Sequence, residues 1–414
     1  MAGQLHGVRQ GWAALGFAVG LAWVLVAAAP RVHAQALPAD RLAADLREEV
    51  RRIEVTVKDL YGRQETRSIA LTVFRPPGPG PFPLAIFSHG RAVADRRAQQ
   101  GRQRFETQAR WLVEKGFAVF VPTRVSYGDT YGEFDPEDSG PCQGKRYEPM
   151  ARAAADQAMA ALAHAQTQPD IDTSRWIKLG VSLGGTTTLA VAARQPPGLV
   201  AAINFAGGAG GNPDERTGDP CGPAVLEALW RQQAATARVP TLWLYWTHDR
   251  YWGEQIPRRW ARAWAEGGGQ VDFQQLGPWL VPASRAAAAD GGPPRPVDGH
   301  NGLGSDMDRW VPLAEAFLAR AGFTRSGLPL RPGQSGFARV EEAEKVPVTA
   351  QRREQLYRAF LRAPSPRAFV IGPDGRAAWA SGDWAIGRAL GLCQWRDGQR
   401  CRLYAVDDEV VWSP

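Results

Sequence analysis

The sequence has few cysteines, few histidines and no concentration of charge. None of its four cysteines forms a C-x-x-C pair or stands at zinc-site spacing from one of the six histidines, so no metal site is expected. The formal net charge of +7 is spread without a run of five like charges, which argues against a nucleic-acid partner. Charged residues make up 22% and hydrophobic residues 44% of the chain, which excludes a disordered chain, a coiled coil and a polytopic membrane protein.

The N-terminus, in contrast, has a distinctive pattern. Residues 12–29 carry no charge, follow Arg9, and lead into two small-residue cleavage sites that end at Ala34 and Ala36. This pattern predicts a secretory signal peptide over residues 1–34, with a retained membrane anchor as the alternative because about 18 apolar residues can just span a bilayer. We therefore expect a periplasmic or secreted protein without stable membrane insertion once the peptide is cleaved.

Residues 35–325 alternate between strand and helix patterns. The first two apolar runs are predicted to pair as antiparallel strands, and the later runs alternate with apolar residues at helical spacing. Strands are expected at residues 53–57, 69–74, 84–87, 117–121, 177–181, 199–205, 241–246 and 271–275, with helices around 105–113, 150–165, 186–194, 223–237, 255–266 and 310–319. This alternation predicts an α/β domain with a mostly parallel sheet covered by helices on both faces. The 16 tryptophans indicate a large core or an aromatic-lined pocket.

The last part of the chain has a different pattern. Residues 326–340 are predicted to be a linker that is rich in arginine, proline and glycine. Residues 341–414 are predicted to form a small α+β module, in which Gly372-Pro373-Asp374-Gly375 separates the strands of a hairpin. The pattern resembles no known family, and a role in stability or docking is expected, with binding of substrate or cell envelope as the alternative.

One motif carries chemistry. Gly180-Val181-Ser182-Leu183-Gly184 matches G-x-S-x-G, between an apolar strand and a helical run. In that context the motif forms a sharp turn that exposes the serine hydroxyl above the sheet, and its glycines allow the strand and helix to approach closely. We predict that Ser182 is a nucleophile; a glycine-rich turn with a capping serine is the alternative.

A serine nucleophile needs a general base, and the base needs a carboxylate to orient it. The order along the chain for this type of turn is serine, acid, histidine. Two of the six histidines lie in the export segment, two more precede Ser182, and His248 adjoins the best acid candidate. His300, in a loop after the last strand, is therefore the expected base.

The expected acid is Asp249. It stands three residues past the end of the strand at 241–246, where a carboxylate could reach the Nδ1 atom of His300. Asp290 and Asp298 are rivals, but both belong to the histidine loop rather than to a strand end.

Stabilising an oxyanion requires two hydrogen-bond donors. The backbone N–H of Leu183 is one candidate, because it lies at the start of the helix after the nucleophile. The backbone N–H of Arg91 is the other, in the loop Ser88-His89-Gly90-Arg91 after the strand at 84–87. His89 is expected to shape that loop rather than to act as a base.

Together these residues resemble the α/β-hydrolase superfamily, and within it the dienelactone-hydrolase-like serine esterase group. The resemblance covers roughly residues 50–325 and implies an eight-stranded, mostly parallel sheet, no cofactor, and hydrolysis of an ester, thioester or lactone in a small-molecule substrate. One feature departs from the family, because dienelactone hydrolases in the strict sense use cysteine where this chain has Ser182. A serine peptidase of the same fold, or a binding protein that has lost catalysis, is the alternative.

An even number of cysteines in an exported protein predicts two disulfides. Cys393 is expected to pair with Cys401 across a polar, turn-forming segment. In the strand order that the resemblance implies, the loops of Cys142 and Cys221 emerge on either side of the nucleophile, so these two are expected to pair, with pairing to the C-terminal cysteines as the alternative. The first loop also carries an acidic patch that is expected to be solvated rather than a calcium site: Glu133, Asp135, Glu137 and Asp138.

Overall fold

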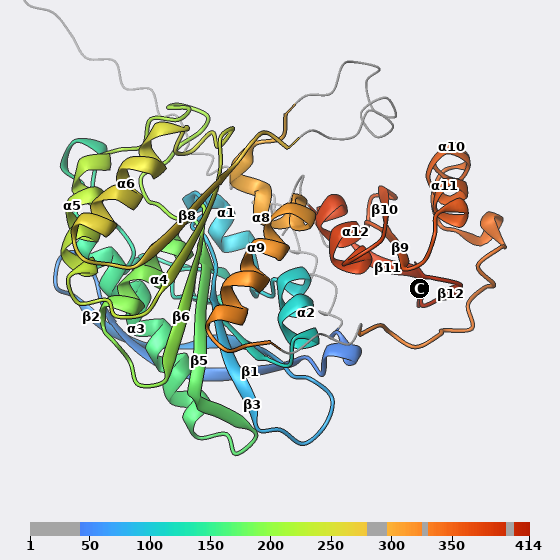
Figure 1. The fold of residues 1–414 in the computed structure, drawn as a ribbon, viewed down its shortest axis with the longest axis horizontal. Helices are drawn as coiled ribbons and strands as arrows, with labels where there is room; N and C mark the ends of the chain where they lie inside the picture. Colours follow the sequence, from blue (N-terminus) through green and yellow to red (C-terminus); the bar gives the residue numbers. More distant parts are fainter. Residues whose placement is uncertain (1–41, 280–295, 325–329, 395–400) are drawn as a thin grey trace, which may run out of the picture. The chain divides into compact units, whose positions relative to one another are not determined.

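The computed structural model describes residues 42–279, 296–324, 330–394 and 401–414 (Figure 1). The predicted signal peptide at residues 1–34, both cleavage sites and Asp290 lie outside the described residues. Within those ranges, no helix combines the length and apolar character needed to cross a membrane. The same ranges contain no group of three or more His, Cys, Asp and Glu side chains that could hold a metal ion.

A central sheet of eight strands organises the larger part of the chain (Figure 1). Its order is β1-β2-β4-β3-β5-β6-β7-β8, in which β2 runs antiparallel to both neighbours and all pairs from β4 to β8 are parallel. The mostly parallel sheet predicted from the sequence is confirmed. Because the carboxyl ends of these parallel strands meet at one edge, that edge is where a ligand would bind. The strands are β1 (Glu49–Lys58), β2 (Gln64–Phe74), β3 (Phe82–Ser88), β4 (Ala118–Pro122), β5 (Ile171–Val181), β6 (Leu199–Phe205), β7 (Thr241–Trp246) and β8 (Val271–Leu276).

Burial along the strands follows their positions in the sheet. The edge strand β1 buries only alternate residues in its second half, Ile53, Val55 and Val57, so its other face meets solvent. Every residue of the inner strand β7 is buried, as expected for a parallel strand covered on both faces. The tryptophan excess belongs mainly to this core, which fully buries Trp111, Trp176, Trp230, Trp243, Trp246, Trp252, Trp260, Trp264 and Trp310.

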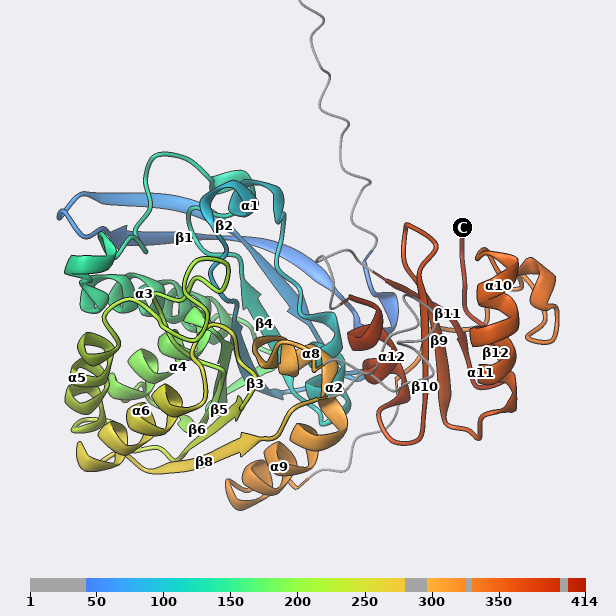
Figure 2. The same cartoon turned by 90° about the horizontal axis from the view of Figure 1, so that it is seen from above.

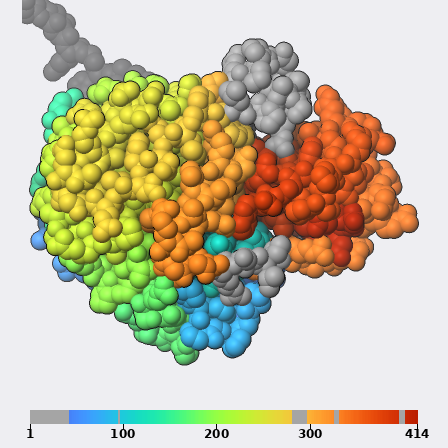
Figure 3. Space-filling view, in the orientation of Figure 1, coloured from blue at the N-terminus to red at the C-terminus, as the bar shows by residue number. Residues whose placement is uncertain are grey.

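Helices cover both faces of the sheet (Figures 1 and 2). On one face α3 packs against α4, and α5 packs against α6. On the other face α2 and α9 meet through an edge-to-face contact between Trp111 and Trp310, with ring centroids 5.2 Å apart. Figure 3 shows α9 as orange surface beside the green and yellow surface of the preceding elements. The helices are α1 (Ala94–Gln99), α2 (Glu106–Glu114), α3 (Tyr147–Gln166), α4 (Leu183–Ala193), α5 (Pro223–Ala234), α6 (Gln255–Glu266), α8 (Gly302–Ser305) and α9 (Met307–Arg320), with short 3-10 turns at Ala44–Leu46, Gly128–Thr130, Cys142–Gly144 and Gly299–Asn301.

The C-terminal part of the chain forms its own antiparallel sheet, of order β10-β9-β11-β12. One cluster in it is built around Tyr357, Phe369 and Tyr404, and it also buries Ala338 and Val340 from the end of the segment predicted as a linker. A second cluster packs α12 against β9 and β10. The elements are a 3-10 turn at Ala343–Lys345, α10 (Ala350–Arg352), a π-helical turn at Arg353–Tyr357, α11 (Arg358–Arg362), β9 (Arg367–Ile371), β10 (Ala377–Ser381), α12 (Ala385–Gln394), β11 (Arg402–Val406) and β12 (Glu409–Val410).

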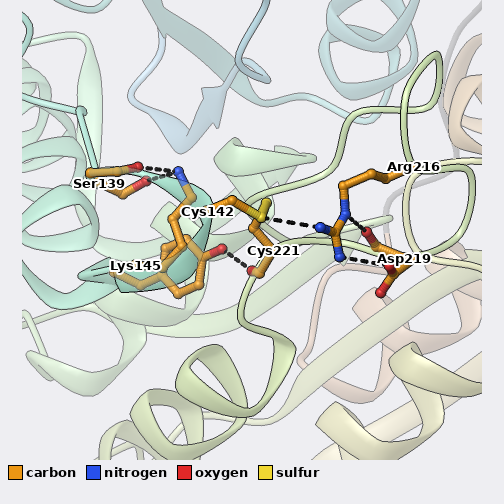
Figure 4. The surroundings of a disulfide bond; sticks show 8 residues. Ser139, Cys142, Lys145, Arg216, Asp219 and Cys221 are labelled. Carbon is orange, nitrogen blue, oxygen red and sulfur yellow. Dashed lines mark hydrogen bonds and ion pairs between the residues drawn. A yellow bond between two sulfur atoms is a disulfide. The ribbon is translucent and has the colours of Figure 1, made fainter.

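All four cysteines are in disulfides, in the two pairs expected from the sequence. Cys393 and Cys401 are joined within the C-terminal part of the chain. Cys142 and Cys221, 79 residues apart in sequence, are joined with their Cα atoms 5.0 Å apart. Figure 4 shows this second bridge, in which Arg216 Nη1 donates a hydrogen bond of 3.4 Å to Cys142 Sγ. The bridge ties the loop after β4 to the loop after β6, on either side of β5 in the sheet.

Candidate active site

Ser182 lies at a sharp turn between β5 and α4. Its backbone has φ 56° and ψ −122°, a sparsely populated conformation that costs about 1–3 kcal/mol for a residue with a side chain. The turn requires glycine on both sides, because a Cβ on Gly180 would overlap the carbonyl of Gly184, and one on Gly184 would overlap the carbonyl of Ser88. Helix α4 begins at Leu183, three residues earlier than the sequence pattern predicts. This is the geometry expected of a nucleophile elbow.

Asp249 and His300 are in direct contact. Asp249 is buried three residues after β7, and its Oδ2 lies 3.0 Å from His300 Nδ1. The other carboxylate oxygen accepts hydrogen bonds from the N–H groups of Tyr251 at 2.8 Å and Trp252 at 3.2 Å. The carboxylate is therefore fixed by backbone donors, and in turn it orients the imidazole. With Nδ1 donating to Asp249, Nε2 is the nitrogen that can accept a proton.

Asp298, a rival for the acid, has a different position. Its Oδ1 accepts hydrogen bonds from the N–H of Arg250 at 2.9 Å and from the N–H of His300 at 3.0 Å. It therefore links the backbone of the Asp249 loop to the backbone of the His300 loop and leaves the imidazole to Asp249. The remaining rival, Asp290, lies outside the described residues.

Aromatic rings surround the imidazole. Tyr251 stacks on His300 with ring centroids 3.9 Å apart, and Trp252 meets it edge-on at 5.4 Å. Burial alone would lower the pKa of His300, but the Asp249 carboxylate, with a smaller contribution from Asp298, raises this pKa above its ordinary value. The site thus favours the charged form of the ring, which a base must adopt when it accepts a proton.

Backbone donors lie beside the nucleophile. A Cβ on Gly90 would be 3.1 Å from Ser182 Cβ and 3.5 Å from Ser182 Oγ, so the loop after β3 runs along the serine side chain. Across the described part of the chain, the N–H groups of Leu183 and Arg91 donate to no acceptor, as donors for an oxyanion would. In the same part of the chain no hydrogen bond joins Ser182 Oγ to His300, and such bonds often tighten only when substrate is bound.

The side chain of Arg91 faces acidic residues of its own chain. Its Nη2 lies 2.5 Å from Asp135 Oδ2, and its Nη1 lies 3.7 Å from Glu137 Oε2. Asp135 also pairs with Arg97 at 2.7 Å. The prediction of a solvated acidic patch is therefore wrong for Glu137, which is fully buried against Arg124. Asp135 is partly buried and paired with Arg91 and Arg97.

Three residues around this site were not predicted from the sequence. Tyr251 and Trp252 hold both the Asp249 carboxylate and the His300 ring, and the signal for them is two aromatic residues that closely follow the acid. The third residue is Arg124, which donates hydrogen bonds to the carbonyls of His89 and Gly90. No pattern around it in the sequence indicates that contact.

The sequence of residues 99–226 matches the model of the dienelactone hydrolase family. The matched segment contains Ser182 and the Cys142–Cys221 disulfide, and it ends before Asp249 and His300. No curated protein matches the sequence.

Several solved structures are similar to this chain. The acylaminoacyl peptidase of Pyrococcus horikoshii is 14% identical over 70% of this chain and 43% of its own, with a TM-score of 0.41. A puromycin-hydrolyzing peptidase of Mycobacterium tuberculosis is 19% identical over 56% of this chain and 36% of its own, with a TM-score of 0.38. A dienelactone hydrolase-like promiscuous phosphotriesterase from metagenomic libraries is 18% identical over 68% of this chain and 99% of its own, with a TM-score of 0.40. The chain spans less than half the length of the two peptidases.

The family match and the observed topology agree with the resemblance seen in the sequence. The matched segment covers β4, β5 and β6 of the sheet and the turn that carries Ser182. The sheet around it has eight strands and is antiparallel only at β1 and β2, which agrees with the eight-stranded, mostly parallel sheet that the resemblance implies. Residues 99–226 are therefore similar to the dienelactone hydrolase family, and they form the centre of a mostly parallel eight-stranded sheet.

Proposed function

We propose that the protein is an exported serine hydrolase that cleaves a carboxylic ester, thioester or lactone through an acyl-enzyme intermediate on Ser182. The observation that carries this proposal is the hydrogen bond between the buried Asp249 carboxylate and His300 Nδ1. Both residues lie in loops at the sheet edge where β5 ends in the strained turn of Ser182. The family match over the segment with Ser182 supports hydrolysis, and the serine in place of cysteine favours serine esterase chemistry.

In the first half of the reaction, Ser182 Oγ attacks the carbonyl carbon of the substrate while His300 Nε2 accepts the hydroxyl proton. The bond to the alcohol, thiol or lactone oxygen then breaks, and His300 returns the proton to that leaving group. In the second half a water molecule attacks the acyl group on Ser182 while His300 accepts its proton. The bond between the acyl carbon and Ser182 Oγ then breaks, His300 returns the proton to Oγ, and the acid is released. The charge that His300 acquires in each half is stabilised by Asp249, which agrees with the raised pKa of the ring.

Negative charge develops on the former carbonyl oxygen in both halves. The N–H groups of Leu183 and Arg91 supply two hydrogen bonds to it, and the start of α4 adds its dipole. None of these steps requires a cofactor. Removal of one such donor costs about 10²–10³-fold in kcat in comparable enzymes.

Export is part of the proposal. The predicted signal peptide supports it, and so do the two disulfides, because such bonds persist in oxidising compartments. N-terminal sequencing of the protein recovered from its native host would test it. A mature N-terminus just after Ala34 or Ala36 is expected. An intact N-terminus in the membrane fraction would show instead that the segment is a retained membrane anchor.

Two measurements test the chemistry. A fluorophosphonate probe should label wild-type protein on Ser182 and leave Ser182→Ala unlabelled. A panel of acyl esters and aminoacyl amides should show faster turnover of the esters. Faster turnover of the amides would replace the proposal by a serine peptidase of the same fold, and absence of both labelling and turnover would leave a binding protein.

A further inference from the structure

A buried ion pair lies behind the loop that carries Gly90 and Arg91. Arg124 follows β4, and its Nε lies 2.5 Å from Oε1 of Glu137, with both side chains fully buried. A buried ion pair is weak evidence for stability, because removing two charges from water costs about as much as their attraction returns. Stability alone therefore does not explain the presence of this pair, and its other contacts indicate a second role.

The guanidinium also holds the backbone of the loop. Arg124 Nη1 donates a hydrogen bond of 2.6 Å to the carbonyl of His89, and Nη2 donates one of 3.3 Å to the carbonyl of Gly90. The backbone N–H of Arg124 donates to His89 Nε2 at 3.0 Å, so the proton of that ring is on Nδ1, which donates to the Gly90 carbonyl at 2.7 Å. Burial, together with Arg124, lowers the pKa of His89 well below its ordinary value, which agrees with a neutral ring. The Gly90 carbonyl thus accepts two hydrogen bonds from the protein interior.

This arrangement determines where the next N–H points. The peptide between Gly90 and Arg91 is planar and trans, so its carbonyl and its N–H point in opposite directions. With the carbonyl held on the inner side, the Arg91 N–H is directed away from Arg124, on a segment that runs beside Ser182. We infer that Arg124 is a positioning residue: held by Glu137, it fixes the Gly90 carbonyl and thereby aims the Arg91 N–H at the oxyanion.

The chemistry of the side chain fits this role. Arginine presents several donors in a rigid plane and stays charged, so one side chain can hold two carbonyls and a carboxylate together. A lysine has a single ammonium and cannot reproduce that geometry. The inference rests on the proposed acyl transfer at Ser182, because only that reaction gives the Arg91 N–H a charge to stabilise.

The experiment compares three variants with wild type. Arg124→Gln combined with Glu137→Gln removes both charges of the pair, and Arg124→Lys keeps a charge opposite Glu137. Arg97→Gln is the matched control, because Arg97 binds Asp135 and Ser126 in the same region and contacts neither His89 nor Gly90. For each variant, kcat and KM are measured on an acyl ester, together with the affinity for a trifluoromethyl ketone, which forms a tetrahedral adduct on the serine.

The double variant should lose about 10²-fold in kcat and Arg124→Lys about tenfold, with KM within about threefold. Affinity for the trifluoromethyl ketone should fall in parallel with kcat, and the pH at which His300 titrates should not move. A purely structural role would lower the melting temperature without this parallel loss. The control should stay within about threefold of wild type in kcat.

The inference is overturned if both Arg124 variants keep kcat and trifluoromethyl ketone affinity within threefold of wild type, or if only KM rises. If circular dichroism shows that the double variant does not fold, Arg124→Lys alone tests whether Arg124 positions the Arg91 N–H. Failure of the proposed function is a separate result, because wild-type protein would then show neither fluorophosphonate labelling nor ester turnover.

Discussion

Two groups of residues approach Ser182 from opposite sides of β5, and they are built differently. The side proposed to bind the oxyanion, called here the oxyanion side, consists of residues 88–91 with Arg124 and Glu137, and a fully buried ion pair holds it. The acid–base side consists of Asp249, His300 and the aromatic residues beside them, and one carboxylate and two rings hold it.

The difference follows from what each side has to do. A backbone N–H donor keeps the same charge throughout the reaction, so a permanent ion pair is a suitable support. In the proposed reaction His300 gains and loses a proton, so its surroundings have to accommodate both forms. Asp249 stabilises the charged ring, and the stacked ring of Tyr251 lies against it in either form. Under the proposed mechanism, the polar interior near the oxyanion side has a role in function as well as in packing.

The largest expected effect comes from a change that leaves both sides intact. Ser182→Ala should lose about 10⁶-fold in kcat, as in other serine hydrolases, while residual turnover above the uncatalysed rate reports the oxyanion side together with substrate binding. Ester turnover and circular dichroism are the measurements. If the folded variant kept near wild-type turnover, Ser182 would not be the nucleophile. The comparison of two sides around it would then no longer hold.

Breaking the acid–base side should cost less. Asp249→Asn should lose about 10⁴-fold in kcat, because an amide no longer imposes the correct tautomer on His300. Asp298→Asn is the control and should lose less than about tenfold, because an amide oxygen can still accept from the N–H groups of Arg250 and His300. The opposite ranking in steady-state kinetics would move the acid to the His300 loop.

The pH profile distinguishes the two sides more finely. His300 must be neutral to act as base, and its raised pKa places the acid limb of kcat/KM above about pH 6.5, the ordinary value for histidine. In Asp249→Asn the limb should move to lower pH, since burial, which lowers the pKa, is then largely unopposed. In Arg124→Lys the limb should stay in place. A limb that moved in Arg124→Lys and not in Asp249→Asn would contradict the division into two sides.

The smallest effect on turnover is expected for the Cys142–Cys221 bridge. Replacing both cysteines by serine should raise KM a few-fold and leave kcat and the acid limb unchanged, because the bridge lies outside both sides. On the chain-entropy model, loss of a cross-link over 79 residues lowers the free energy of unfolding by about 4.5 kcal/mol. Thermal unfolding and ester kinetics measure the two effects, with the Cys393–Cys401 pair changed in the same way as a control. A drop in kcat matching that of the Arg124 variants would make the bridge part of the oxyanion side.

The sequence predicts much of this architecture because the parallel strands are short, apolar and well separated. The strand at 241–246 matches β7, and the helix at 255–266 matches α6. His300 could be singled out because it is the only histidine downstream of the acid candidates. Helix α4 begins earlier than predicted because glycines weaken the helical pattern, whereas the turn at Ser182 starts the helix at once.

The buried charges could not be predicted in this way. Arg124 and Glu137 are 13 residues apart in a loop that has no periodic pattern. Because several carboxylates lie close together in that loop, the sequence predicts that it is solvated. Whether a charge is buried depends on which loops the sheet brings together, and those loops come from β3 and β4. Likewise, only the spatial contact separates Asp249 from Asp298 as the partner of the His300 ring.

The edge-on contact of Trp252 with His300 also gives the site an optical signal. A charged imidazole quenches the fluorescence of a neighbouring indole, whereas a neutral one does so weakly, and the two rings are 5.4 Å apart. The difference in fluorescence emission between wild type and Trp252→Phe, measured as a function of pH, therefore contains the titration of His300. Because that signal requires no turnover, it reads the protonation of the base in Ser182→Ala as well, where the kinetics can no longer report it.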